Sequence, residues 1–322
     1  MTWKGMFKMN VKLRAAATAL LLLGSPALTS AGESGPWRFD YANDIGYMAG
    51  SMDYDIGGIV TDGGSVSRDN DPLSKLEFPF NVFMLSVRGG VTYSDLVETR
   101  LDYSRNINDP RSRMKDSDWT DNYNPSLKTI YSESSAALNA SLLDASVRIW
   151  AVKKRDAGGN VTAAFGPGAG YYYQNLHWDA GNGEQWYPSD PTRPHDKFRG
   201  LAITYDAKIF APYVALYGKL NVARLLLEGD LGWCFVTTQE VDDHVIRDKI
   251  SRTHGTGHGI KANLSAKYFA GKDFYLQSRL GLFSFAVKGN QYQDFGGGYI
   301  LTIEDKTRSE QFSFSLGAGY RF

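Results

Sequence analysis

The sequence predicts an all-β protein: a transmembrane antiparallel β-barrel of ten strands, with short periplasmic turns and long extracellular loops. Three observations predict it: a secretory leader, amphipathic segments separated by connections of two unequal lengths, and a final strand that ends on Phe322. In residues 312–322, apolar or small residues alternate with small or polar ones, which gives a strand one apolar and one polar face. A closed barrel pairs such a last strand with the first and turns the apolar face to lipid; a soluble sandwich is the weaker alternative.

Residues 1–31 have the pattern of a secretory signal peptide. A basic segment without acidic residues precedes the apolar run 15–23, and small residues at Thr29 and Ala31 fit cleavage after Ala31. The apolar run is too short to span a bilayer as a helix, and no later stretch of about 20 apolar residues follows. We therefore expect a signal peptide over 1–31, one barrel domain over 32–322, and a place in a bacterial outer membrane with the functional site facing outside.

The composition excludes several other classes. The 35 basic and 35 acidic residues balance, and loss of the leader removes four basic residues, so the mature chain is slightly acidic and offers no support for nucleic-acid binding. A mean hydropathy of −0.34 with 13% aromatic residues suits strands that are apolar on one face only. Cys234 is the single cysteine, so the chain forms no internal disulfide and the thiol is interpreted as packing.

The connections predict the strand count. Four short ones are expected at 88–90, 153–160, 218–221 and 270–273, and five long polar ones at 51–73, 106–128, 178–198, 243–257 and 288–299. Nine connections join ten strands and leave both chain ends on the side of the short turns. That asymmetry is typical of outer-membrane barrels.

Strand parity predicts which side chains share the lumen. In residues 225–235 the odd positions are apolar and are expected to face lipid, so the even positions face inward. Continued upward, this parity directs Glu240, Asp242 and His244 into the lumen. In the strand before the loop at 106–128 the even positions again face inward. Extended through the base of that loop, the same parity directs Asp116 and Asp118 inward, although Pro110 or a bulge could break it.

Two acidic patterns therefore meet at the outer mouth of the predicted barrel. Asp242 can orient His244, which can take a proton from water, while Asp116 or Asp118 holds that water for attack on a carbonyl. The common alternative is that such loop residues are merely solvated or bind a cation. We expect no metal site, because His254 and His258 lie four apart in a glycine-rich segment, not on a helix.

The segment from Asp116 to Pro125, which reads Asp-Ser-Asp-Trp-Thr-Asp-Asn-Tyr-Asn-Pro, resembles the omptins, a family of ten-stranded outer-membrane endopeptidases. The tract 205–216 and the run 242–244 resemble further segments of that family. The resemblance implies one catalytic pair in Asp116 and Asp118 and another in Asp242 and His244. It places Glu240 in the pocket for the side chain before the scissile bond, where a carboxylate favours Arg or Lys.

The resemblance also implies residues outside that core. Ser132 falls where omptins have a serine once suspected as the nucleophile, and Asp53 or Asp55 is the candidate for a second acid in the pocket. Omptins need lipopolysaccharide as an activator and no other cofactor. Here Tyr171 and Lys208 match basic or aromatic positions of its binding site.

Two positions of that lipid site depart from the family, because Tyr173 and Asn175 stand where omptins have Glu and Arg. The implied partners are peptide or protein substrates at the cell surface, outer-membrane lipid and lipopolysaccharide. A non-enzymatic barrel, either an adhesin or a structural protein, is the alternative class, and a lipid A-modifying barrel enzyme stays open. A diffusion pore is disfavoured, because side chains largely fill a ten-stranded lumen.

Overall fold

The computed structural model describes residues 36–108, 111–158, 160–297 and 299–322, so the predicted signal peptide at 1–31 lies outside the described residues. Within this part of the chain no helix is long and apolar enough to cross a membrane. Thirteen strands are present, and their bounds are as follows: β1 (Trp37–Asp62), β2 (Ser65–Arg68), β3 (Ser74–Tyr93), β4 (Val97–Asn106), β5 (Ser112–Asp118), β6 (Ile130–Ile149), β7 (Val152–Arg155), β8 (Val161–Trp186), β9 (Asp196–Val222), β10 (Leu225–His244), β11 (Lys249–Phe269), β12 (Phe274–Asp294) and β13 (Ile300–Arg321).

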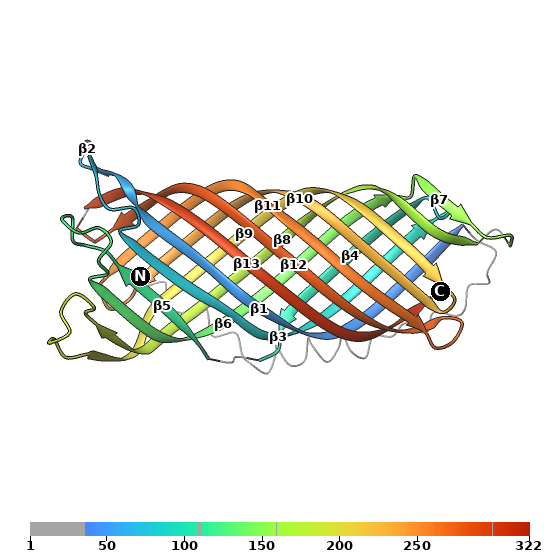
Figure 1. The fold of residues 1–322 in the computed structure, drawn as a ribbon, viewed down its shortest axis with the longest axis horizontal. Helices are drawn as coiled ribbons and strands as arrows, with labels where there is room; N and C mark the ends of the chain where they lie inside the picture. Colours follow the sequence, from blue (N-terminus) through green and yellow to red (C-terminus); the bar gives the residue numbers. More distant parts are fainter. Residues whose placement is uncertain (1–35, 109–110, 159, 298) are drawn as a thin grey trace, which may run out of the picture. The chain divides into compact units, whose positions relative to one another are not determined.

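The strands close into a ring of ten positions (Figure 1). Closure is made by β1, which pairs antiparallel with β13 on one side and with β3 on the other. β4 and β5 occupy one position in succession, since both lie between β3 and β6. β2 and β7 are short strands that pair only with β1 and β8. The all-β, ten-stranded barrel is therefore confirmed.

Several predicted connections differ from the structure. Residues 51–62 of the expected loop at 51–73 belong to β1, and 178–186 of the expected loop at 178–198 belong to β8. Residues 88–90 lie inside β3 and 218–221 inside β9, while the real turns are at 94–96 and 223–224. Ser94, Asp95 and Ala223 adopt positive φ there, so the tight turns do not use the glycines on which the prediction rested. The predicted long loop at 243–257 is only the four residues 245–248, because β10 and β11 pair as far as His244 and Lys249.

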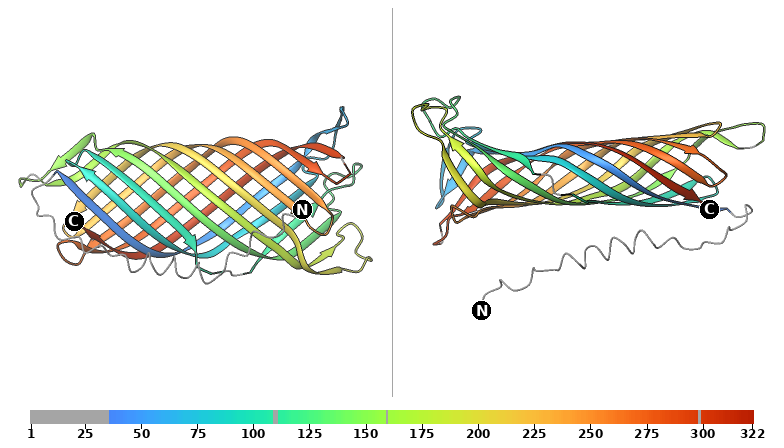
Figure 2. Two further views of the ribbon diagram at one scale, coloured as in Figure 1. Left: turned by 180° about the vertical axis from the view of Figure 1, so that it is seen from behind. Right: turned by 90° about the horizontal axis from the view of Figure 1, so that it is seen from below.

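The outer wall changes from apolar to polar along the height of the barrel. Near the end with the short turns, here called the turn end, outward-facing side chains such as Leu231, Trp233 and Phe235 are about half exposed and form an apolar belt. Toward the opposite end, here called the loop end, outward positions of β10 become polar at Gln239 and Asp243. Figure 2 shows the strands running on at a tilt between the two ends. A strand needs about 9–11 residues to cross a bilayer, and most of these are twice that long. The barrel therefore stands well above its belt.

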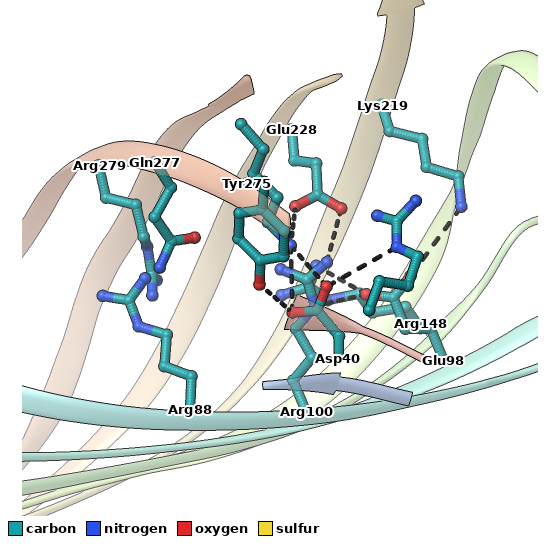
Figure 3. Close-up of polar contacts among 12 residues, drawn as sticks. Asp40, Arg88, Glu98, Arg100, Arg148, Lys219, Glu228, Tyr275, Gln277 and Arg279 are labelled. Atoms are coloured by element: carbon teal, nitrogen blue, oxygen red, sulfur yellow. Dashed lines mark hydrogen bonds and ion pairs between the residues drawn. The ribbon is translucent and has the colours of Figure 1, made fainter. Parts of the chain in front are cut away.

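Ion pairs fill the lumen at the level of the belt (Figure 3). Arg100 lies 2.5 Å from Glu98 and 2.5 Å from Glu228, and Lys267 lies 3.4 Å from Glu228 and 3.3 Å from Asp40. Every carboxylate of this lumen network has a Lys or Arg nitrogen within 4.0 Å, and the carboxylates concerned are Asp40, Asp44, Glu98, Asp102, Asp144, Glu228 and Asp230. Charges that are buried in compensating pairs plug the lumen and hold the strands in register.

Breaking this network from one side should weaken the barrel. Glu228→Gln leaves Arg100 and Lys267 short of one charge in a buried site, which should cost about 3 kcal/mol of unfolding free energy. Glu310→Gln, on the exposed outer wall, is the matched control and should change stability by less than about 0.5 kcal/mol. Urea unfolding of both variants in detergent micelles measures the difference. Equal stability of the two variants would show that the lumen network contributes nothing specific.

Candidate active site

The candidate residues gather at the loop end because two strands deliver inward-facing side chains there. β5 supplies Asp116 and Asp118, and the end of β10 supplies Asp242 and His244. All four side chains are buried, between 2% and 8% exposed. Both strand segments lie beyond the apolar belt, so the side chains sit above the level of the belt, where the lumen opens.

Asp242 and His244 form a couple. Nε2 of His244 lies 2.8 Å from Oδ2 of Asp242, and the Tyr54 hydroxyl donates to the same oxygen. Burial alone would raise the pKa of Asp242, but the charge and hydrogen bond of His244, together with Lys249, outweigh it and lower that pKa. Asp242 is thus an ionised carboxylate that holds the imidazole ring in one orientation and leaves Nδ1 on its other side.

Asp116 and Asp118 form a second pair, in which the partner's charge raises a carboxyl pKa instead of lowering it. Burial and the negative charge of Asp118 together raise the pKa of Asp116 to about 8, because Arg247 offsets them only in part. Asp116 therefore carries a proton at neutral pH. Asp242 also contributes to this pKa, so the acidic pair and the Asp–His couple lie within electrostatic reach of each other. Oδ1 of Asp116 has no hydrogen-bond partner among the described residues.

An aromatic floor lies under the couple. The rings of Phe78 and Tyr205 stack with centroids 4.3 Å apart, and Tyr54 and Trp178 pack against Tyr205 at 5.5 and 5.7 Å. The Tyr205 hydroxyl donates to Oε2 of Glu240 at 2.7 Å. Glu240 is 3% exposed and is one inward position below Asp242 on β10, so it lies deeper in the lumen.

The sequence reasoning missed two residues of this region. Tyr54 takes the inward position on β1, and on either side of it Asp53 pairs with Lys75 and Asp55 with Arg308 at 3.3 and 3.0 Å. Both acids are thus paired with cations, and the charge of Asp55 also acts on Asp305, so the placement of Asp53 or Asp55 in the pocket stays a prediction. Strand parity counted from the belt could have identified Tyr54.

Asp305 on β13 is the second missed residue. It is 2% exposed, and the negative charge of Glu240 acts on its carboxyl group. No sequence motif identifies Asp305, because a single Asp between polar neighbours is equally typical of a surface loop. Its place near Glu240 depends on the register of β13 against β1 and β12, which a single sequence does not reveal.

The remaining candidates lie apart from the couple or only border it. Ser132 points inward from β6 directly across from Asp116, and within the described ranges no hydrogen bond joins it to His244. Lys208 and Tyr171 lie on the outer wall. Lys208 faces Asn175 on β8 and Gln239 on β10, while Tyr171 faces Pro212.

Comparison with known proteins supplies the family. The Omptin family model matches residues 65–310. The crystal structure of the outer membrane protease OmpT from Escherichia coli is similar with a TM-score of 0.76, covering 89% of this chain and 97% of that chain at 17% identity. At that identity the likeness shows the fold. No curated protein matches by sequence.

Other barrels are more distant. The outer membrane protein OprG from Pseudomonas aeruginosa matches with a TM-score of 0.38, at 10% identity over 89% of this chain and 98% of that chain. The translocator domain of the autotransporter NalP from Neisseria meningitidis matches with a TM-score of 0.36, at 12% identity over 97% and 94%. The family model covers most of the chain and the barrel fold agrees with it: this chain belongs to the omptin family.

Proposed function

We propose that this protein is an outer-membrane endopeptidase whose active site opens at the cell surface. The observation that carries the proposal is the buried Asp242–His244 couple beside a carboxyl pair that keeps a proton at neutral pH. Such an arrangement offers a base and an acid in one confined site. Membership of the omptin family and the fold shared with a protein described as an outer membrane protease support the same reading.

The proposed mechanism divides the chemistry between the two pairs. His244 takes a proton from a water molecule, and Asp242 stabilises the resulting imidazolium. The imidazolium then gives this proton to the amine nitrogen as the peptide C–N bond breaks. Asp118 holds the water for attack, while protonated Asp116 donates a hydrogen bond to the carbonyl oxygen as negative charge develops on it. Water acts as the nucleophile, because Ser132 has no hydrogen bond to a base that could activate it.

Glu240 gives the proposed enzyme its preference for a basic residue before the cut. Its carboxyl group lies one inward position below Asp242 and is enclosed by the aromatic floor. A long cationic side chain can reach past the scissile bond to that depth. Arg can form two parallel hydrogen bonds to a carboxylate, so it should be preferred over Lys.

Lipopolysaccharide is the proposed activator, bound on the outer wall at Lys208 and Tyr171. Both side chains belong to the outward face of β8 and β9, and Lys208 makes no ion pair with any described residue, which leaves its charge available to a lipid phosphate. Asn175 and Tyr173 supply no charge beside it. We therefore propose a weaker requirement for the lipid than the family pattern implies. A non-enzymatic adhesin remains the competing class, and it needs none of the four buried side chains.

The first test removes each catalytic candidate in turn. Asp116→Ala, Asp118→Ala, Asp242→Ala and His244→Ala should each lower turnover of a peptide substrate by about 10²–10⁴-fold, because each loses an acid–base role. Ser132→Ala should keep most of its activity. Asp243→Ala, the outward-facing neighbour, is the matched control. Full activity in the His244 or Asp242 variant would refute the proposed mechanism.

The second test uses pH. Activity should fall above about pH 8, where Asp116 loses the proton it is proposed to donate. Asp118→Asn removes the neighbouring negative charge, so it should lower the pKa of Asp116. The infrared band of the protonated carboxyl would then vanish at a lower pH than in the Asp243→Asn control. Activity that keeps rising above pH 8 would contradict the donor role of Asp116.

The third test concerns Glu240. Glu240→Gln should weaken cleavage after Arg or Lys by about 1.5–3 kcal/mol in transition-state binding, the range for a hydrogen bond to a charged group. Cleavage at uncharged sites should be comparatively unaffected. Matched peptides that differ only in the residue before the cut measure both rates. An equal loss on every peptide would assign Glu240 a structural role.

A further inference from the structure

Glu240 is not alone at the floor of the pocket, because Asp305 reaches the same place from β13. One hydroxyl group bridges the two acids: Oγ1 of Thr307 lies 3.0 Å from Oε2 of Glu240 and 3.1 Å from Oδ1 of Asp305. Both carboxyl groups are almost fully buried, 3% and 2% exposed. They therefore act on each other through a shared hydrogen-bond partner and a medium with little water.

At Thr307 a single hydroxyl group contacts both carboxyl groups. A threonine hydroxyl has a single hydrogen, so Thr307 can donate to Glu240 or to Asp305 but not to both. The second contact is a hydrogen bond only if the other carboxyl group is protonated and donates to the hydroxyl. Tyr205 donates to the oxygen of Glu240 that Thr307 already contacts, and Thr253 and Gln291 donate to Oδ2 of Asp305 at 3.3 and 3.2 Å. The contact geometry thus accommodates one proton within the pair.

The surrounding charges agree with this reading. Among the described residues, no Lys or Arg nitrogen lies within 4.0 Å of either carboxyl group, in contrast to the lumen network below. The groups that face the pair are Asp242 from β10, Tyr54 and Asp55 from β1, and Tyr205 from β9. None of these is a cation. Burial raises the pKa of Asp305 well above its usual value, with the charge of Glu240 adding to it, and burial likewise raises the pKa of Glu240.

An open hydrogen-bonding position points to a ligand. Oε1 of Glu240 is buried, and within the described part of the chain no donor meets hydrogen-bond geometry with it; the Thr238 hydroxyl, which is also buried and also lacks such a partner, lies close enough to lower the pKa of Glu240. A buried acceptor without a partner is costly, and a guanidinium or ammonium group entering from the mouth would satisfy it.

We propose that Asp305 and Glu240 form a single cation-binding carboxyl pair, which holds one proton when the pocket is empty and releases it to solvent when an Arg or Lys side chain enters. The inference rests on the proposed function, and it makes Asp305 a specificity-determining residue. The exchange balances: one proton leaves as one cation arrives, and no covalent bond changes. Affinity for the basic side chain then falls as the pH is lowered, since protons compete with the cation.

Calorimetry of the full barrel in detergent with N-acetyl-argininamide tests the proposal without any cleavage. This probe lacks a free α-amino group, and its guanidinium keeps its charge, so any proton released comes from the protein. Titrations at pH 7 in two buffers of different ionisation enthalpy give the number of protons released. The wild-type protein should release about one proton for each cation bound. Asp305→Asn should release close to none, because Glu240 is then ionised in the empty pocket.

Asp53→Asn is the control, since it removes an acid from the same end of the barrel that already has a cationic partner in Lys75. It should behave as the wild-type protein. Binding without proton release, no binding of the probe, or equal loss of release in the Asp53 variant would each overturn the inference. Peptide cleavage, measured separately, distinguishes the two proposals. Cleavage after Arg without proton release refutes the carboxyl pair alone, whereas proton release without cleavage refutes the endopeptidase alone.

Discussion

The two-residue alternation of side chains, maintained over strands about twice as long as a bilayer requires, is the constraint on which this structure depends. At the height of the belt the outward positions are apolar, so every inward position is left to polar or buried groups. Above the belt the same inward rows continue while the outer wall becomes polar. Asp242 and His244 are simply the uppermost inward positions of β10. The site is thus held by the barrel wall and not by a flexible loop.

The carboxyl groups inside the lumen fall into two sets, which differ in whether a cation lies beside them. At the height of the belt each one has a cationic partner, and the pairs fill the interior. Toward the loop end, Asp116, Glu240 and Asp305 are buried with acidic neighbours instead. Burying a carboxyl group without a cation favours its protonated form. This contrast gives the lower lumen a structural role and leaves the upper lumen with groups ready to exchange protons or to bind a cation.

The sequence predicted the parts that depend on local alternation. The inward direction of Glu240, Asp242 and His244 follows from counting along one uninterrupted strand, and the structure has the same parity. Tyr54 was missed because the prediction relied on residue type and took the acids Asp53 and Asp55 as candidates, although parity on β1 turns Tyr54 inward. Asp305 could not be found, since its neighbour across the lumen is set by the register of β13 against β1 and β12, which no local pattern records.

The most direct test of the account is intact-mass measurement of the refolded protein, quenched during turnover of a peptide with one Arg. The account predicts cleavage after that Arg and an unchanged protein mass throughout, because water attacks the carbonyl and no covalent intermediate forms. A protein mass increased by the acyl part of the peptide, located at Ser132, would contradict the water mechanism. Intact peptide after prolonged incubation with lipopolysaccharide present would contradict the endopeptidase itself.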